Sequence, residues 1–113
     1  MLIPDVIEKN GRSTKSFDLG TKLFEDRIVY LYGEINEDTA NIAIMQLLWL
    51  NASNPELPID LYINSPGGCV YQGMAIKDII HKIQPKVNTF GLGICASMGA
   101  YILSSGTGIR KAS

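Results

Sequence analysis

The stretch TFGLGICASMGAYIL, residues 89–103, joins an apolar run directly to a helical pattern. The run from Phe90 to Ile94 is short and apolar, which predicts a buried strand. The residues after it recur at the spacing of one helix face: Met98, Tyr101, Ile102 and Ser105. Ser97 therefore lies where a strand is expected to turn into a helix.

Ser97 has small neighbours, namely Ala96, Gly99 and Ala100, so a tight turn there could present its hydroxyl without crowding. The first N–H groups of a helix lack partners within the helix and carry partial positive charge. The Met98 amide could thus hold an oxyanion formed when Ser97 attacks a carbonyl group. Two interpretations stay open for this stretch alone: a nucleophile turn, or a junction whose small residues only permit close packing.

A second turn is predicted about thirty residues earlier by the same kind of reasoning. The run IDLYI at 59–63 predicts a strand, and NSPGG at 64–68 ends it, because proline cannot donate to a sheet and glycine adopts conformations that other residues avoid. A helix is expected over 70–83 and another strand over 87–94. Strands that alternate with helices are typical of a parallel sheet.

The two predicted turns fall at the same edge of that sheet. Ligands of open α/β sheets bind at the carboxyl ends of strands, and both SPGG and Ser97 follow such ends. The amides of Gly68 and Met98 would then face one cleft and supply two donors beside Ser97. Considered without Ser97, SPGG is equally compatible with an ordinary tight turn.

The first half of the chain predicts one strand and one long helix. IVYLYG at 28–33 predicts the strand, and Asn36 is a suitable N-cap for a helix over 37–51. One face of this helix is expected to contain Ala40, Ile44, Leu47 and Leu48. Its other sides are also largely apolar, which predicts a second neighbour and hence an oligomer. We expect an arm at 1–16 and a short amphipathic helix over 17–27.

The length and the net charge of the chain limit the classes of protein to which it can belong. The 113 residues suffice for one domain with a core, and the net charge of −1 gives no basic footprint for nucleic acid. The sequence shows neither a secretory signal nor a run long enough to span a membrane, so we expect a cytoplasmic location. Cys69 and Cys95 are too few for a disulfide framework and lack histidines at ligand spacing, which predicts reduced thiols and no metal.

Four motifs resemble those of the ATP-dependent Clp protease proteolytic subunit, ClpP. They are YINSPGG at 62–68, GMAIKD at 73–78, IQPKV at 83–87 and ASMGA at 96–100. IPDVIE at 3–8, SFD at 16–18 and LLWLNASNPE at 47–56 match in the same order and spacing. The resemblance covers essentially the whole chain. It implies an α/β fold of the crotonase-like, ClpP type, a repeated ββα superhelix with a mostly parallel sheet, here truncated.

The resemblance also implies an activity, an assembly and a set of site residues. The family is a group of serine endopeptidases that degrade unfolded proteins inside two stacked heptameric rings. AAA+ Clp ATPases gate these rings and use the ATP, so no cofactor is implied for this chain. Residues 1–16 would line the axial pore, and residues 17–113 would form the N-terminal part of the protease domain. The implied roles are Ser97 as nucleophile, the amides of Gly68 and Met98 as oxyanion hole, and Gly67, Cys69 and Val70 as residues that bind an extended peptide by strand addition.

Two members of the family's catalytic triad have no counterpart in this sequence. The histidine and aspartate come further along the family's chain than Ser113, where this sequence ends. The only histidine, His81, would lie roughly 17 Å along its helix from the cleft, on a solvated face at the helix C-terminus. A serine without a positioned base is a poor nucleophile. We therefore expect the 113 residues alone to be inactive.

Two other functions remain open. A non-catalytic ring subunit or interaction module is favoured by the apolar helix over 37–51, although the retention of Ser97 argues against it. A serine–lysine peptidase of the same fold would use a lysine such as Lys111 as its base. The close SPGG match, and the lack of a signal or membrane segment, count against that second alternative.

Overall fold

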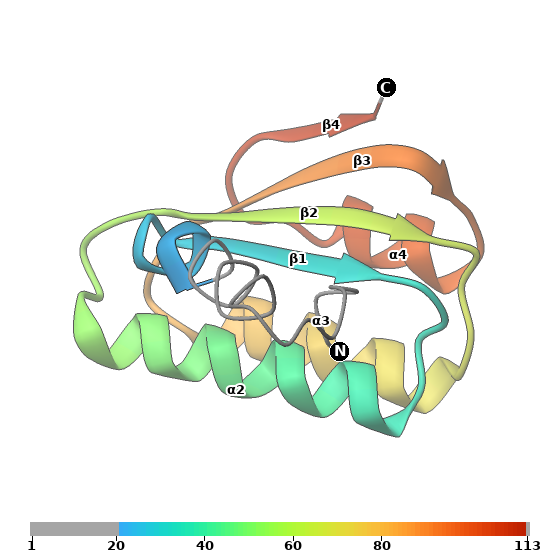
Figure 1. Cartoon of the computed structure of the whole chain (residues 1–113), viewed down its shortest axis with the longest axis horizontal. Coiled ribbons are helices and arrows are strands. Elements are labelled where there is room, and N and C mark those ends of the chain that lie inside the picture. Colours follow the sequence, from blue (N-terminus) through green and yellow to red (C-terminus); the bar gives the residue numbers. More distant parts are fainter. Residues whose placement is uncertain (1–20, 113) are drawn as a thin grey trace, which may run out of the picture.

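The computed structural model describes residues 21–112, in which strands and helices alternate along the chain (Figure 1). The arm expected at 1–16 lies outside the described residues. The helix expected over 17–27 begins outside them and is helical at 21–25. The elements that follow are β1 (Ile28–Tyr32), α2 (Glu37–Ser53), β2 (Ile59–Ser65), α3 (Val70–Lys82), β3 (Val87–Cys95), α4 (Met98–Ser104) and β4 (Arg110–Ala112).

The four strands form one parallel sheet in the order β1-β2-β3-β4, which confirms the predicted α/β class. Val29 of β1 pairs with Leu61 of β2, and Leu61 pairs in turn with Thr89 of β3. On the far side, Thr89 pairs with Arg110 of β4. Because all four strands run the same way, their carboxyl ends share one edge of the sheet. The SPGG turn and Ser97 both follow strands at that edge.

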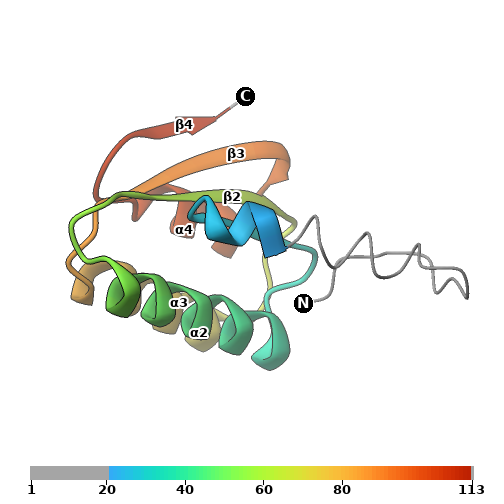
Figure 2. The same ribbon diagram turned by 60° about the vertical axis from the view of Figure 1, so that its left-hand side comes forward.

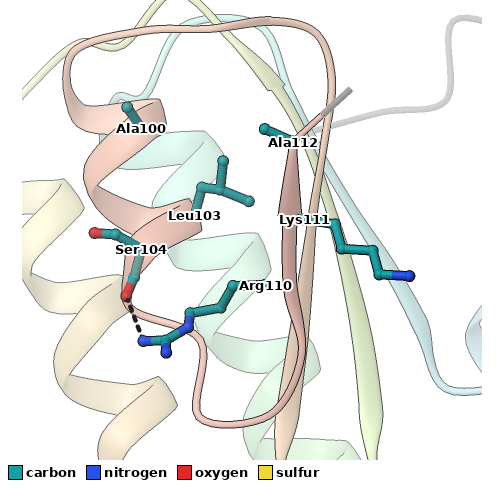
Figure 3. Close-up of a pocket in the computed structure, with 6 residues that line it drawn as sticks. All are labelled: Ala100, Leu103, Ser104, Arg110, Lys111 and Ala112. Atoms are coloured by element: carbon teal, nitrogen blue, oxygen red, sulfur yellow. Dashed lines mark hydrogen bonds between the residues drawn. The ribbon is translucent and has the colours of Figure 1, made fainter.

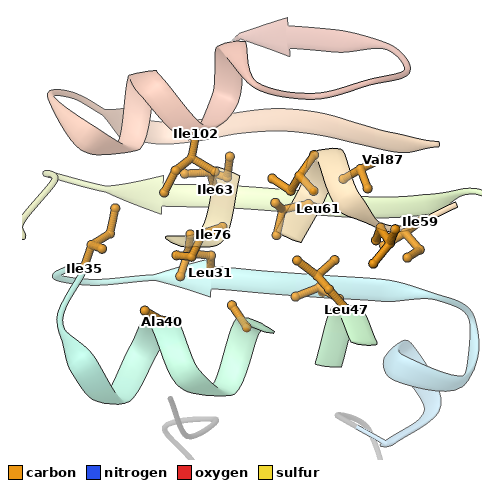
Figure 4. Close-up of a cluster of buried hydrophobic side chains, with 14 of the residues drawn as sticks. Leu31, Ile35, Ala40, Leu47, Ile59, Leu61, Ile63, Ile76, Val87 and Ile102 are labelled. Atoms are coloured by element: carbon orange, nitrogen blue, oxygen red, sulfur yellow. The ribbon is translucent and has the colours of Figure 1, made fainter. Parts of the chain in front are cut away.

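Helices α2, α3 and α4 lie against one face of the sheet (Figures 1 and 2). Burial alternates along the whole of β2, because successive strand side chains point to opposite faces. The buried side chains of strands and helices meet in one layer between sheet and helices (Figure 4). Fully buried members of this core include Leu31, Leu61, Ile63, Leu47, Ile76, Ile80 and Ile102.

Helix α2 begins with the predicted cap. The Thr39 amide donates to the Asn36 side chain at 3.0 Å, and the Asn36 amide donates to the Thr39 hydroxyl at 2.9 Å. The predicted buried face is only partly right, since Leu48 is 44% exposed. The buried stripe instead contains Ala40, Ala43, Leu47 and Leu50.

Several apolar side chains of α2 face outward. Met45 and Trp49 are about three-fifths exposed, at 60% and 61%. The second neighbour that the sequence predicts for this helix is therefore not supplied by residues 21–112. None of the helices in this part of the chain has the length and apolar character needed to cross a bilayer.

The far end of α2 is tied to the start of β1 by Arg27. The Arg27 guanidinium donates to the carbonyls of Leu50, Asn54 and Leu57 at 3.2, 2.8 and 2.9 Å. Its Nε also donates to the Pro58 carbonyl at 3.0 Å. Burial lowers the pKa of this guanidinium from its ordinary value. Arg27 thus closes the end of α2 and the loop after it, and it does so with a φ of 65°.

Candidate active site

Ser97 lies between the end of β3 and the start of α4, as the sequence predicts. Its φ of 52° and ψ of −122° fall in a region that residues other than glycine rarely occupy. The residue is exposed and its side chain makes no capping hydrogen bond to α4. A strained strand-to-helix junction that leaves a hydroxyl free is the geometry of a nucleophile turn.

Glycine at two positions allows the Ser97 turn and the SPGG turn to touch. A Cβ atom on Gly67 would lie 2.7 Å from the Ser97 Cβ and 3.1 Å from the Met98 nitrogen. A Cβ atom on Gly99 would lie 2.8 Å from the Ser65 carbonyl oxygen. Such approaches are shorter than van der Waals contact, so only glycine fits at both positions. The two turns, thirty residues apart in the chain, are therefore in direct backbone contact.

The SPGG turn is fixed on its other side by Ile35, in an isolated parallel bridge between Ile35 and Gly68. The Ile35 amide donates to the Gly67 carbonyl at 2.9 Å, and the Cys69 amide donates to the Ile35 carbonyl at 2.8 Å. Successive amides of an extended chain point to opposite edges. The Gly68 amide therefore points away from Ile35.

Met98 supplies the second amide beside this turn. As the first residue of α4 it has no partner for its N–H within the helix. Its side chain is 9% exposed and packs against α3, where a Cβ atom on Gly73 would collide with the Met98 methyl group. The packing against Gly73 holds the start of α4, and with it the Met98 amide, close to Gly67.

The three residues expected to bind a peptide differ in whether their backbone groups already have partners within the chain. Gly67 donates to the Ser65 hydroxyl at 3.1 Å and accepts from Ile35, while Cys69 donates to Ile35 and accepts from the Gly73 amide at 3.0 Å. The backbone groups of both residues are thus already used within the chain. Val70 is 55% exposed and, as the first residue of α3, has an amide without a helical partner.

Sequence reasoning missed two residues that shape the site. Ser65 is fully buried, its hydroxyl accepts from the Gly67 amide, and its carbonyl accepts from the Ala96 amide at 3.1 Å. Ile35 holds the SPGG turn by its backbone. Serine two residues before glycine is a recognised turn signal and could have pointed to Ser65. The role of Ile35 depends on tertiary pairing and leaves no mark in the local sequence.

Two cysteines flank the site, and both are free thiols. The Cys95 sulfur lies against Gly91, where a Cβ atom would be 3.6 Å away, and the side chain packs on the apolar core. Burial raises the pKa of the Cys95 thiol. Cys95 therefore fills apolar space beside the turn. Within residues 21–112, no group of three or more His, Cys, Asp or Glu side chains is placed to hold a metal ion.

The two side chains considered as bases lie away from Ser97. The His81 Nε2 is 2.9 Å from the carbonyl oxygen of Ser105, at the opposite end of α4, about 12 Å from Ser97 at 1.5 Å per helical residue. Lys111 lies on the edge strand β4, where it pairs with Phe90 in the middle of β3, and its side chain points away from α4 (Figure 3). Neither side chain is in position to take a proton from the Ser97 hydroxyl.

A comparison with protein-family models matches residues 11–113 of the chain to the family described as Clp protease. The matched range contains β2, β3 and the two turns that follow them. It therefore includes every residue of the site described above.

Proposed function

The chain belongs to the Clp protease family, a family of serine peptidases, and on this premise we propose that Ser97 is the nucleophile of an endopeptidase subunit. The observation that supports the proposal most strongly is the contact between Gly67 and Ser97, since it brings the SPGG turn to the strained serine. In the proposed reaction the Ser97 hydroxyl gives its proton to a general base, which neither His81 nor Lys111 supplies, and its oxygen attacks the carbonyl carbon of a peptide bond. The carbon becomes tetrahedral and its oxygen becomes an oxyanion. The C–N bond then breaks as the leaving amine takes the proton, and water hydrolyses the acyl group from Ser97.

We propose that the amides of Gly68 and Met98 bind this oxyanion. The Gly68 amide points away from its partner Ile35, and the Met98 amide begins a helix whose dipole is positive at that end. Donors fixed before the reaction stabilise the developing charge without reorganising, and each such donor contributes roughly 100- to 1000-fold in rate. Backbone donors of this kind need no metal or cofactor.

The same geometry supports a proposal for how a peptide substrate binds. Gly67 and Cys69 face Ile35, whereas the intervening Gly68 faces the opposite side and Val70, the first residue of α3, has an amide without a helical partner. We therefore propose that a peptide pairs with the backbone of Gly68 and Val70, two residues apart as strand addition requires, while Gly67 and Cys69 only shape that edge. A substrate bound in this way must be extended, which favours unfolded polypeptides over folded proteins.

Assembly is the second part of the proposal. Members of the family generally form oligomeric rings that work with Clp ATPases. In this chain, the outward-facing Met45, Leu48 and Trp49 of α2 present the apolar surface that such a contact would bury. We propose that copies of the subunit pack through this face, and that an AAA+ ATPase uses ATP to deliver unfolded chains to the ring. A cytoplasmic location would suit that partnership.

The proposal is tested with a fluorophosphonate, which reacts only with an activated serine. The 113-residue chain is expected to label slowly, because neither His81 nor Lys111 reaches Ser97. The product of a reading frame that continues past Ser113 through a histidine and an aspartate is expected to label rapidly. Ser97→Ala should abolish the rapid labelling, whereas Ser104→Ala, which alters an exposed serine of the same helix, should leave it unchanged. Rapid labelling that survives Ser97→Ala would contradict the proposal.

A non-catalytic ring subunit is the second candidate, and the exposed face of α2 favours it. In that case the chain should co-purify with an active protease ring, and Ser97→Ala should leave the activity of the mixed ring unchanged. Loss of co-purification in Trp49→Glu, with retention in Glu56→Lys, would identify α2 as the contact. The serine–lysine alternative is disfavoured by the position of Lys111.

A further inference from the structure

We propose that α4, the helix that begins directly after Ser97, is held at its opposite end by side chains of three other elements, and that Thr89 is a positioning residue for Ser97. The three side chains are Thr89 of β3, Arg110 of β4 and His81 of α3. We call them the carbonyl clamp. The consequence for catalysis rests on the proposed role of Ser97, whereas the clamp itself does not.

Each clamp residue binds one of three consecutive carbonyls where α4 ends. The Thr89 hydroxyl donates to the Leu103 carbonyl at 2.6 Å. The Arg110 guanidinium donates to the Ser104 carbonyl at 3.4 Å, as Figure 3 shows. The His81 Nε2 lies 2.9 Å from the Ser105 carbonyl and must donate to it, because a carbonyl oxygen only accepts.

The two carbonyls before these are bound inside the helix end itself. The Tyr101 carbonyl accepts from the Ser105 hydroxyl at 2.7 Å, and the Ile102 carbonyl accepts from the Ser105 amide at 3.0 Å. The last carbonyls of a helix have no intrahelical donors. In α4 all five carbonyls from 101 to 105 find a partner, and three of these partners come from separate elements of the fold.

Thr89 makes the strongest of the three contacts. It is fully buried, and its amide is fixed in the sheet by a 2.8 Å hydrogen bond to the Ile109 carbonyl. Gly106 packs directly on its hydroxyl, where a Cβ atom would collide. Arg110 and His81 are exposed, and the contribution of the Arg110 guanidinium includes the attraction of a cation to the negative end of a helix.

The clamp bears on Ser97 because α4 is very short. A helix of seven residues is marginal without tertiary contacts, and a strained residue persists only where its surroundings fix it. The start of α4 is fixed by the contact of Gly99 with Ser65 and of Met98 with Gly73. The clamp fixes the other end. Anchored at both ends, the helix cannot rotate to relax the φ of Ser97.

Hydrogen exchange measured by mass spectrometry on the 113-residue chain tests the clamp. Thr89→Val removes the hydroxyl at nearly constant volume and should speed exchange of the peptide 97–105 roughly tenfold, while the peptide 37–53 changes less than twofold. Thr89→Ser, which keeps the hydroxyl, should restore slow exchange. Thr39→Val is the matched control, because it removes the hydroxyl that accepts from the Asn36 amide in the capping box of α2 and should speed exchange in 37–53 alone.

Several outcomes would overturn the clamp. They are faster exchange in both peptides alike, unchanged exchange in 97–105, or equal behaviour of Thr89→Val and Thr89→Ser. Should Thr89→Val fail to fold, the double variant His81→Ala and Arg110→Ala, which alters only exposed residues, should speed exchange in 97–105 about threefold. No change in that variant would equally count against the clamp.

Positioning of Ser97 is tested separately, in the longer product described above. There Thr89→Val should slow fluorophosphonate labelling of Ser97 at least fivefold, and Thr89→Ser should restore it. If exchange responds as expected but labelling does not, the clamp is structural only and Thr89 is not a positioning residue. If wild-type Ser97 does not label, the proposed function fails while the exchange result stands.

Discussion

Arg27 and Ser97 are the two non-glycine residues with positive φ in the described part of the chain, at 65° and 52°, and they lie at opposite edges of the sheet. Arg27 precedes β1, and its side chain makes four hydrogen bonds to carbonyls around the end of α2. Ser97 follows β3, and its side chain makes no capping hydrogen bond. One strained backbone is thus compensated by its own side chain, whereas the other is held by its neighbours.

The strain at Arg27 is compensated by hydrogen bonds from its own side chain to the fold, whereas the strain at Ser97 lies in the proposed active site. The proposed role of Ser97 requires its hydroxyl to stay available to a base and a substrate, so hydrogen bonds from that hydroxyl to the fold cannot compensate the strain. At Ser97 the compensation comes from glycines that permit backbone contact and from packing at both ends of α4. At Arg27 removal of the side chain should remove the compensation directly.

The largest expected effect is at Gly67, whose lack of a side chain lets the two turns meet. Gly67→Ala should lower the free energy of unfolding by about 4 kcal/mol, because its φ is 106° and the new Cβ would meet the Ser97 Cβ. Gly33→Ala is the matched control, since Gly33 also has positive φ but has no atom within 4 Å of an added Cβ. Urea unfolding measures both, and equal losses would show that the contact with Ser97 is unimportant.

Removal of the Arg27 side chain should come second. Arg27→Ala is expected to cost about 2–3 kcal/mol of unfolding free energy, because four carbonyl acceptors lose a charged donor. Arg27→Lys should recover only part of this, as a single ammonium group cannot span the four acceptors. A loss below about 0.5 kcal/mol in Arg27→Ala would mean that solvent replaces the side chain at this edge.

The strain at Ser97 is measured by a smaller effect of opposite sign. Ser97→Ala keeps the Cβ atom and should leave the free energy of unfolding unchanged within about 0.5 kcal/mol. Ser97→Gly removes that atom and should stabilise the chain by about 1 kcal/mol, despite the greater freedom of glycine in the unfolded state. If the glycine variant is no more stable than the alanine variant in thermal and urea unfolding, Ser97 is not strained.

The smallest expected effect is on the pH dependence of the free energy of unfolding, through Cys95, which lies close to Ser97 in the chain. Burial raises the pKa of the Cys95 thiol, so the folded state binds more protons than the unfolded state at alkaline pH. The contribution to stability is complete below the ordinary thiol pKa and is lost as the pH rises through the folded value. In a Cys69→Ser background, Cys95→Ala should flatten the alkaline fall in stability. An unchanged slope would assign that fall to other groups.

The sequence predicts the elements well where one signal dominates. Apolar runs bounded by turn residues place β1, β2 and β3, and Asn36 marks the start of α2. The buried face of α2 was harder to predict, because apolar residues surround most of the helix and the pattern does not say which stripe meets the sheet. The sheet selects the stripe with Ala43 and Leu50, and Leu48 is left exposed.

The residues of the candidate site also differ in how well the sequence predicts them. Ser97 and the SPGG turn stand out because small residues and strand ends coincide there, and the parallel sheet brings them to one edge. The direction of each backbone group is not written in the local pattern, so Gly67 and Cys69 were not distinguished from Gly68 and Val70. Thr89 and Ser65 look like minor polar residues within apolar strands. Their partners are distant carbonyls that only the folded chain supplies.

The bridge between Ile35 and Gly68 connects the backbone that we propose binds the substrate to helix α2. Ile35 immediately precedes Asn36, the N-cap of α2, so a single peptide unit separates the helix from the bridge. A movement of α2 is therefore passed directly to the bridge. If a second copy packs against α2 as proposed, a sideways shift of this helix would move the Gly68 amide with it, so the outer surface of α2 would influence the proposed oxyanion hole.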